Sequence, residues 1–229
     1  DLEEFADQHL GARQGAGEIL FNAVDTTRFC PAPRPVRPVT FLVAGKIEHH
    51  LYNRVGDAVM ALAALRKGGI EARLIVAGSL DDESARRAEA DIARFGLDTE
   101  VDLLGPYSQA EAPAIYQRGD VYLMTKPNDP CPNTVLEAMA CGLPVVYSAT
   151  GGVPELAGDT GWPLKVEEST QKMVWPLTGP LTDAMAAASI RFAEQGEAAR
   201  ERAREHFDIA PWIARHRAVF EALLAQGQE

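Results

Sequence analysis

The sequence predicts an α/β fold, a Rossmann-like parallel sheet with helices on both faces. From residue 39 onward, short apolar segments typical of strands alternate with longer segments typical of helices, which is the pattern of a parallel sheet. Right-handed crossovers would place the successive helices on both faces of that sheet. Loops that contain glycine or proline follow several of the strands, at the edge where such sheets bind ligands.

Each element follows from a local pattern in the chain. The strands are short apolar runs bounded by turn residues, and they are expected at residues 39–44, 73–77, 101–104, 120–124, 143–147 and 162–166. The first helix follows a loop at residues 47–53, and its apolar face is formed by Val55, Val59, Met60, Leu62, Ala63 and Leu65. Further helices are expected at residues 81–95, 109–117, 181–193, 197–205 and 207–224.

Length and composition indicate a globular protein. With 229 residues, of which 46% are hydrophobic, the chain suits one domain with appendages or two small domains. A net charge of -11 disfavours a nucleic-acid polymer as partner, because phosphate contacts dominate such binding. Cys30, Cys131 and Cys141 lack metal-ligand spacing, so we expect reduced thiols and a cytoplasmic protein. No apolar run is long enough to cross a bilayer.

The stretch from Thr125 to Glu155 carries the strongest indication of function. The strand that ends at residue 124 is followed by a proline-rich loop at residues 127–132. A helix comes next, and either Asn133 or Thr134 is expected to be its N-cap. Gly142 is expected to end this helix before the next buried strand.

The start of this helix predicts an anion site. A helix that opens beyond a parallel strand points unpaired backbone N–H groups at the crevice, here those of Thr134, Val135 and Leu136. Glu137 lies about one turn into the helix, where its carboxylate can accept hydrogen bonds from ligand hydroxyls. Asp129 lies eight positions earlier, so two carboxylates can flank one bound ligand.

Two further loops are expected to open on the same edge of the sheet. Gly151 and Gly152 follow the next strand and would let the backbone approach a ligand closely. Lys46, which comes directly after Gly45, and Arg54 bracket the loop after the first strand, so cations are expected there. The proline-rich loop at residues 127–132 and the loop at Gly151 and Gly152 follow two adjacent strands. Two ligand loops in this arrangement suggest a nucleotide with another group attached.

The spacing of these motifs resembles a known signature. Seven residues separate Asp129 from Glu137, and Ala-Met-Ala-Cys-Gly-Leu-Pro-Val and Gly-Gly-Val-Pro-Glu follow. This series resembles the donor-binding signature of retaining glycosyltransferases of family 4, the glycosyl transferases group 1, which have the GT-B fold. Residues 18–25, with the sequence Asn-Ala-Val-Asp at their end, resemble the interdomain segment of the same family. The resemblance covers residues 18–225 and implies the C-terminal, donor-binding half of a GT-B fold.

The resemblance also implies a role for each candidate residue. Glu137 would bind the ribose of a nucleotide sugar, and Asp129 would contact the sugar, where the family usually has glutamate. Lys46 and Arg54 would neutralise the donor diphosphate. The other donor-binding positions are Gly45, Pro106, Tyr107, Asn133, Thr134, Val135, Gly151 and Gly152. Pro106 and Tyr107 would lie near the nucleobase, unless Tyr107 packs on the core.

The implied reaction transfers a sugar from a UDP- or GDP-linked donor to an acceptor hydroxyl with retention of configuration. We expect neither a metal nor a cofactor besides this donor, because Lys46, Arg54 and the helix start would stabilise the departing diphosphate. The expected partner is an N-terminal acceptor domain, in cis or in trans. The expected segments are an N-terminal helix and linker remnant at residues 1–17, a nucleotide-sugar-binding domain at 18–207 and a C-terminal crossover helix at 208–229.

Two other functions stay open on the sequence. One is a stand-alone, catalytically inactive nucleotide-binding module, which the shortened Asp129 would permit. The other is an interaction scaffold without a ligand, against which Lys46 and Glu137 count. The loop histidines His49 and His50 lack the third and fourth ligands that a zinc site needs, so they are expected to be ordinary loop residues.

Overall fold

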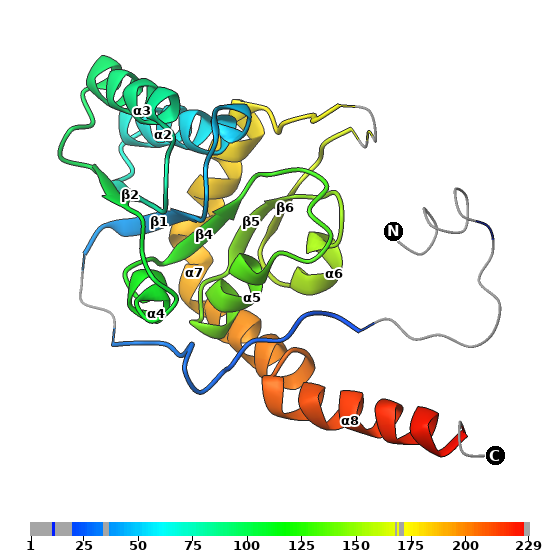
Figure 1. Cartoon of the computed structure of the whole chain (residues 1–229). Helices are drawn as coiled ribbons and strands as arrows, with labels where there is room; N and C mark the ends of the chain where they lie inside the picture. The colour runs from blue at the N-terminus through cyan, green and yellow to red at the C-terminus, as the bar shows by residue number, and fades with distance from the viewer. Residues whose placement is uncertain (1–10, 12–19, 34–36, 168, 170–171, 227–229) are drawn as a thin grey trace.

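The described residues form a six-stranded parallel sheet with helices on both sides (Figure 1). The computed structural model describes residues 11, 20–33, 37–167, 169 and 172–226. The strand order is β3-β2-β1-β4-β5-β6, so the chain builds the sheet outward from β1 first in one direction and then in the other. β1 and β4 therefore flank the topological switch point, where α/β sheets bind ligands. The helix expected within residues 1–17 falls outside the described residues.

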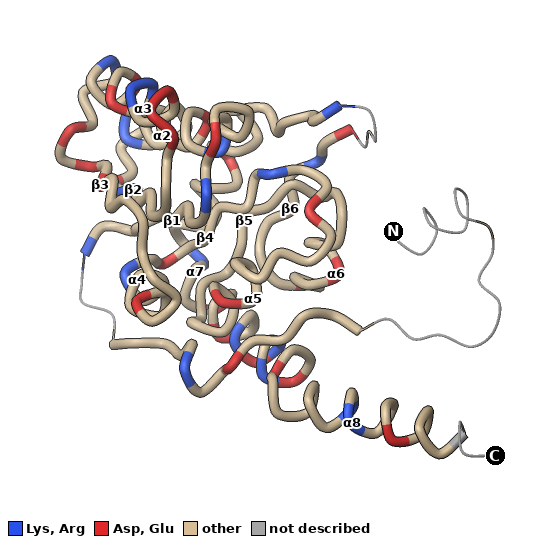
Figure 2. The backbone as a smooth tube through the Cα atoms, viewed as in Figure 1, with Lys and Arg blue, Asp and Glu red and all other residues tan. Residues whose placement is uncertain are grey.

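All six strands form where the apolar runs predict them, with ends shifted by at most two residues. They are β1 Val39–Ala44, β2 Ala72–Ala77, β3 Val101–Gly105, β4 Val121–Met124, β5 Val145–Ser148 and β6 Trp162–Leu164. β1, β4 and β5 contain no charged residue, as their uniform colour in Figure 2 shows. Such strands are typical of a parallel sheet that is covered on both faces.

The helices agree with the predictions less closely. They are α2 Asn53–Lys67, α3 Asp82–Phe95, α4 Ala112–Tyr116, α5 Asn133–Ala140, α6 Val153–Ala157, α7 Thr178–His206 and α8 Ile209–Gln226, with a 3-10 turn η1 at His49–Leu51. The helix expected at residues 109–117 is shorter in the structure, where α4 spans only Ala112–Tyr116. Ser108 and Glu111 form a turn instead, in which the Ser108 N–H donates to Glu111 Oε2 at 2.8 Å.

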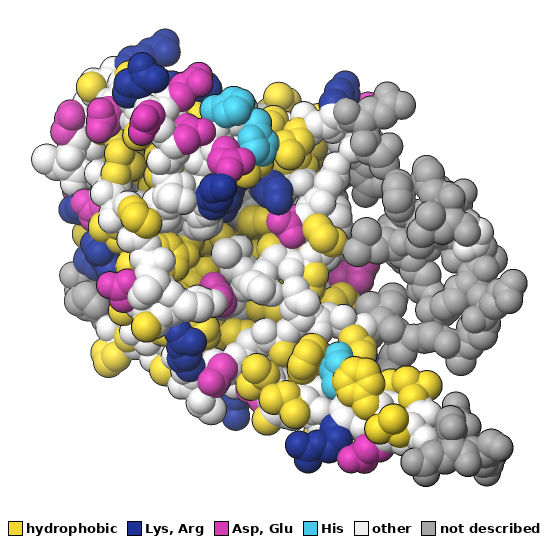
Figure 3. All heavy atoms as spheres, in the orientation of Figure 1, with side chains coloured by type: hydrophobic (Ala, Val, Ile, Leu, Met, Phe, Trp, Pro, Cys, Tyr) yellow, Lys and Arg dark blue, Asp and Glu magenta, His cyan; other side chains and the backbone are white. Residues whose placement is uncertain are grey.

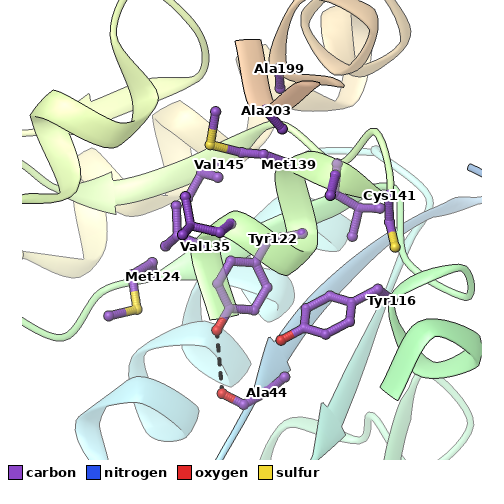
Figure 4. Close-up of a cluster of buried hydrophobic side chains, with 14 of the residues drawn as sticks. Ala44, Tyr116, Tyr122, Met124, Val135, Met139, Cys141, Val145, Ala199 and Ala203 are labelled. Atoms are coloured by element: carbon purple, nitrogen blue, oxygen red, sulfur yellow. Dashed lines mark hydrogen bonds between the residues drawn. The ribbon is translucent and has the colours of Figure 1, made fainter. Parts of the chain in front are cut away.

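Two apolar cores lie on opposite faces of the sheet. Phe41 on β1 belongs to the core under α2 and α3, whereas its neighbour Leu42 belongs to the core under α5, part of which is shown in Figure 4. α7 contributes to both cores, with Leu181 near its start in the first and Ala203 near its end in the second. This helix therefore connects the two layers.

The two helices expected at residues 181–193 and 197–205 are one continuous helix, α7. The reason is the packing of Gly196, which lies between the two predicted segments. A Cβ atom at Gly196 would lie 2.3 Å from the carbonyl oxygen of Gly142. The glycine therefore allows α7 to approach the turn after α5 closely, and it does not interrupt the helix.

The segment at residues 20–33 is held against α7 and α8. The Val24 N–H donates to Phe207 O at 2.8 Å, and the Ile209 N–H donates to Val24 O at 3.1 Å. The Arg200 guanidinium on α7 donates at 2.6–2.8 Å to the carbonyl oxygens of Thr26, Phe29 and Ala140. One side chain thus ties this segment to the end of α5.

α8 extends away from the sheet and exposes apolar side chains (Figure 3). Its first turns are anchored, because the Trp212 Nε1–H donates to Phe21 O at 2.8 Å. Further along, Phe220 is 60% exposed and Leu224 is 69% exposed. No described helix is both long and apolar enough to span a bilayer.

The contact at Gly196 can be tested within one helix. We expect Gly196→Ala to lower the free energy of unfolding by about 1–3 kcal/mol, because the new methyl overpacks a well-filled contact. Gly179 on the same helix has nothing within 4 Å of its Cβ position, so Gly179→Ala should leave stability unchanged or raise it by up to about 1 kcal/mol. Urea unfolding of both variants is the measurement, and equal stabilities would contradict the packing argument.

Candidate functional site

The candidate site lies at the carboxyl ends of β1 and β4, the two strands at the switch point. Directly after β1, the N–H of Gly45 donates to Ala77 O at 3.0 Å, which fixes the start of the loop. The Lys46 side chain is 73% exposed, and its Nζ lies 2.5 Å from Glu48 Oε1. That contact raises the pKa of Lys46. Lys46 is therefore a solvated cation that already has a partner.

Arg54, by contrast, is a buried cation. It is 5% exposed, and its Nη2 donates to Ala44 O at the end of β1 at 2.9 Å. Its Nε is buried without a hydrogen-bond partner, and none of the described carboxylates forms an ion pair with it. The Tyr122 hydroxyl donates to the same carbonyl oxygen at 3.3 Å (Figure 4). The guanidinium is thus held by neutral groups alone.

Glu137 is a buried acidic residue on α5. It is 9% exposed, and its Oε2 accepts a hydrogen bond from the Tyr116 hydroxyl at 2.8 Å. Gln109 donates to Oε1 at a longer distance of 3.4 Å. Burial raises the pKa of Glu137, while the hydrogen bonds from Tyr116 and Gln109 act in the opposite direction.

Tyr107 lies close to both buried charges. Burial, Tyr122 and Glu137 raise its pKa to about 12, and Arg54 acts in the opposite direction. The side chain of Tyr107 is half-buried and packs against the core, whereas Pro106 is exposed. Tyr107 therefore packs on the core, which the sequence analysis gave as the alternative to its contact with the nucleobase.

The start of α5 differs from the prediction in two ways. Neither Asn133 nor Thr134 is the N-cap, because the helix begins at Asn133 after Pro132, with no side-chain cap. The Asn133 Oδ1 instead accepts a hydrogen bond from Asn22 at 2.9 Å. The Val135 N–H, expected to be unpaired, donates to Pro132 O at 3.0 Å.

Asp129 is not a free carboxylate. Its Oδ2 lies 2.9 Å from Nζ of Lys126, and the Asp129 side chain is 18% exposed. The preceding residue, Asn128, has a positive φ of 58°, and its N–H donates to the Thr150 hydroxyl at 3.0 Å. The loop before α5 is therefore held by the loop after β5.

Gly151 and Gly152 contact this neighbouring loop. A Cβ at Gly151 would lie 2.5 Å from Asp129 O, and one at Gly152 would lie 1.9 Å from Pro130 O. The Gly152 N–H also donates to Asp129 O at 3.0 Å. The close backbone approach expected for a ligand is present here between two loops of the protein, and this contact explains why both residues are glycines.

The loop histidines lie beside the switch point. His49 is on the wall of a cavity of about 560 Å³ that is lined by Lys46, Ile47, Glu48, His49, Ser79, Leu80 and Asp81. Its backbone N–H donates to Asp81 Oδ2 at 2.7 Å. Among the described residues, no three His, Cys, Asp or Glu side chains are grouped to hold a metal ion.

Sequence reasoning missed four residues that hold the site. Tyr116 and Gln109 contact Glu137, Lys126 pairs with Asp129, and Asn22 holds the start of α5. Tyr116 and Asn22 act over separations of 21 and 111 residues, for which no local spacing exists. Lys126, three positions before Asp129, was the one contact that a local charge pattern indicates.

Comparison with known proteins identifies the family of the chain. The family model "Glycosyl transferases group 1" matches residues 38–183, which is more than half of the chain. The D-inositol 3-phosphate glycosyltransferase of Pseudarthrobacter chlorophenolicus is 31% identical over 154 residues, covering 63% of this chain and 37% of that protein. This chain thus spans less than half of that relative.

Two solved structures share the fold. HepE from Anabaena, in complex with UDP and glucose, superposes with a TM-score of 0.77 at 18% identity, covering 95% of this chain and 60% of HepE. The C-terminal domain of the glycosyl transferase group 1 family protein LpcC from Francisella tularensis has a TM-score of 0.67 at 18% identity, covering 81% of this chain and 99% of that domain. The family match, together with this fold, shows that the chain belongs to the glycosyl transferases group 1.

Proposed function

We propose that this chain is the donor-binding domain of a retaining, family 4 glycosyltransferase and that a nucleotide diphosphate sugar binds at the switch point between β1 and β4. One observation carries the proposal. Arg54 and Glu137 are both buried there, and they form no ion pair with each other. A nucleotide diphosphate sugar supplies what each lacks, since its diphosphate is anionic and its ribose hydroxyls are hydrogen-bond donors.

In this proposal, Arg54 and the start of α5 bind the diphosphate. The Arg54 guanidinium is fixed by Ala44 O, so it is oriented before the donor arrives. The N–H groups of Asn133 and Thr134 at the first turn of α5 add to the positive field. Lys46 contributes from the solvent side, where it exchanges Glu48 for a phosphate oxygen. Negative charge that develops on the departing diphosphate is stabilised by these groups without a metal ion.

Glu137 binds the ribose, and Tyr107 lies beside the base. The buried carboxylate of Glu137 accepts from a ribose hydroxyl. Tyr107 packs on the core, and the part of its ring that the core leaves exposed lies beside the nucleobase together with Pro106. Asp129 contacts the transferred sugar. The complex of HepE with UDP and glucose supports a UDP-linked donor, and a GDP-linked donor is the alternative.

The acceptor site is assigned to a second domain. The LpcC domain, a C-terminal domain, is matched over 99% of its length, and this supports the same placement for our chain. An N-terminal acceptor domain, in cis or in trans, would close over the donor. The apolar side chains exposed on α8 are a suitable contact for it. Transfer to the acceptor hydroxyl with retention of configuration then takes place between the two domains.

One observation favours a second function, a catalytically inactive nucleotide-binding module. The Asp129 carboxylate, which would contact the sugar, is already paired with Lys126 at 2.9 Å. A chain that binds a nucleotide but gains nothing in affinity from the attached sugar would have this function instead.

Calorimetric titration with UDP, GDP, ADP and their sugar conjugates, in buffer with a chelator, tests the proposal. We expect saturable binding of one nucleotide. Glu137→Ala should weaken it at least about 10-fold, because hydrogen bonds to a charged group are among the stronger ones. His49→Ala, which alters the same edge of the sheet outside the proposed contacts, should stay within about twofold of the unsubstituted chain. Comparable losses at both positions would overturn the assignment of Glu137.

The stability of the ligand-free chain gives an independent test. Because burial raises the pKa of Glu137, the folded state binds its proton more tightly than the unfolded state does. This contribution favours folding below the unfolded pKa and is lost as the pH rises through the folded pKa. At pH 7, above the unfolded pKa, Glu137 is therefore expected to favour folding less than it does at low pH.

We expect Glu137→Gln to raise the free energy of unfolding at pH 7 by an amount on the order of 1 kcal/mol. The gain should shrink as the pH falls toward about 4, the ordinary range of a glutamate. The amide oxygen of the new glutamine still accepts the Tyr116 hydrogen bond. Urea unfolding at several pH values is the measurement, with the exposed Glu197→Gln on α7 as control. A gain that does not depend on pH would contradict the explanation.

A further inference from the structure

Tyr116 donates a hydrogen bond to Glu137, and its own position is fixed by the groups around it. It is the last residue of the short helix α4, and its ring is fully buried. The rings of Phe29 and Tyr122 lie at centroid distances of 6.0 and 5.9 Å from it. The ring cannot turn without disturbing both neighbours. The hydroxyl of Tyr116 is therefore presented to Glu137 Oε2 from one direction only.

The two oxygens of Glu137 are held unequally. Oε2 accepts the Tyr116 hydrogen bond at 2.8 Å, within the usual range, whereas Gln109 Nε2 lies 3.4 Å from Oε1, at the outer limit. Gln109 is also exposed, so its side chain can leave at little cost. One carboxylate oxygen is thus tied to the core, and the other is held only by a weak, solvent-side donor.

We infer that Tyr116 is a positioning residue, which fixes the Glu137 carboxylate so that Oε1 faces a ligand hydroxyl and Gln109 occupies the place of that hydroxyl in the free protein. This inference rests on the proposed function, because it assigns Glu137 to ligand binding. It also assigns different roles to the two side chains that contact this carboxylate. Tyr116 keeps its hydrogen bond when the ligand binds, whereas Gln109 is displaced.

The Tyr116 hydroxyl also favours the ionised form of Glu137. The titratable and charged groups that act on this carboxylate are Tyr116, Arg28, Tyr107 and Tyr122. Among them, the Tyr116 hydrogen bond is the first cause that opposes the rise of the Glu137 pKa on burial. Without it, the buried carboxyl would take up a proton at a higher pH. A protonated carboxyl is a poorer acceptor for a ligand hydroxyl.

Tyr116→Phe removes this hydroxyl and keeps the ring. With whichever of UDP, GDP and ADP binds the unsubstituted chain best, we expect the dissociation constant at pH 7 to rise about 10-fold. We also expect binding to be lost at a higher pH in the variant as the solution is acidified. Tyr147→Phe, which removes a buried hydroxyl elsewhere in the same core, should change neither quantity. Gln109→Ala should leave the affinity within about twofold.

A ligand-free measurement separates this inference from the proposed function. Carbon-13 NMR of labelled glutamate carboxyls, with Glu137 assigned through Glu137→Gln, reports its titration directly. In Tyr116→Phe the Glu137 resonance should titrate at a higher pH than in the unsubstituted chain and in Tyr147→Phe. If no nucleotide binds the unsubstituted chain, the proposed function fails and the titration still decides the role of Tyr116.

Two results would overturn the inference. The first is an unchanged Glu137 titration in Tyr116→Phe. The second is a loss of affinity that is equal at every pH, since it would indicate a role of the Tyr116 hydroxyl that does not involve the protonation of Glu137. An equally large loss in Gln109→Ala would contradict the division between the two neighbours, because Gln109 would then be a lasting contact.

Discussion

The structure depends on the separation of two buried charges. Arg54 and Glu137 lie at the same edge of the sheet and are each nearly excluded from solvent. Arg54 donates to a carbonyl oxygen and Glu137 accepts from a tyrosine hydroxyl, while Arg28 is the cation that acts on Glu137. Burial of a charge without an ionic partner costs several kcal/mol or shifts its protonation. A sequence under selection for stability alone would place these charges together or remove them. Their separation is the observation on which the proposed ligand site rests.

The tyrosines make this separation possible. Tyr122 donates to the same Ala44 carbonyl that holds Arg54, Tyr116 donates to Glu137, and Tyr107 lies close to both charges. The rings of Tyr116 and Tyr122 fill apolar space while their hydroxyls satisfy buried polar groups. The apolar core of this face and the polar site therefore share the rings of Tyr116 and Tyr122, so a substitution of either tyrosine is expected to affect the site.

The sequence predicts the sheet and the order of its loops because these follow from patterns within a few residues of each other. Such local patterns predicted the order of β4, the proline-rich loop, α5 and the turn at Gly142. They also predicted that α3 starts at Asp81, whose side chain accepts from the Ser84 N–H. What the sequence did not predict are contacts between distant residues. These contacts depend on how the helices and loops pack after they have formed. They join Tyr116 with Glu137, Asn22 with Asn133 and Gly196 with Gly142. Gly196 illustrates the limit, since the same residue type ends a helix in one context and permits close packing in another.

The contact between the loop before α5 and the loop after β5 has a consequence for exchanging parts between relatives. Gly151 and Gly152 fit against the backbone of Asp129 and Pro130 with no room for a side chain, and Thr150 holds Asn128 in a left-handed conformation. The two loops therefore form one structural unit. A chimera that takes only the first loop from another glycosyltransferase would bring a backbone that the second no longer matches, whereas a chimera that takes both would keep the contact between them intact.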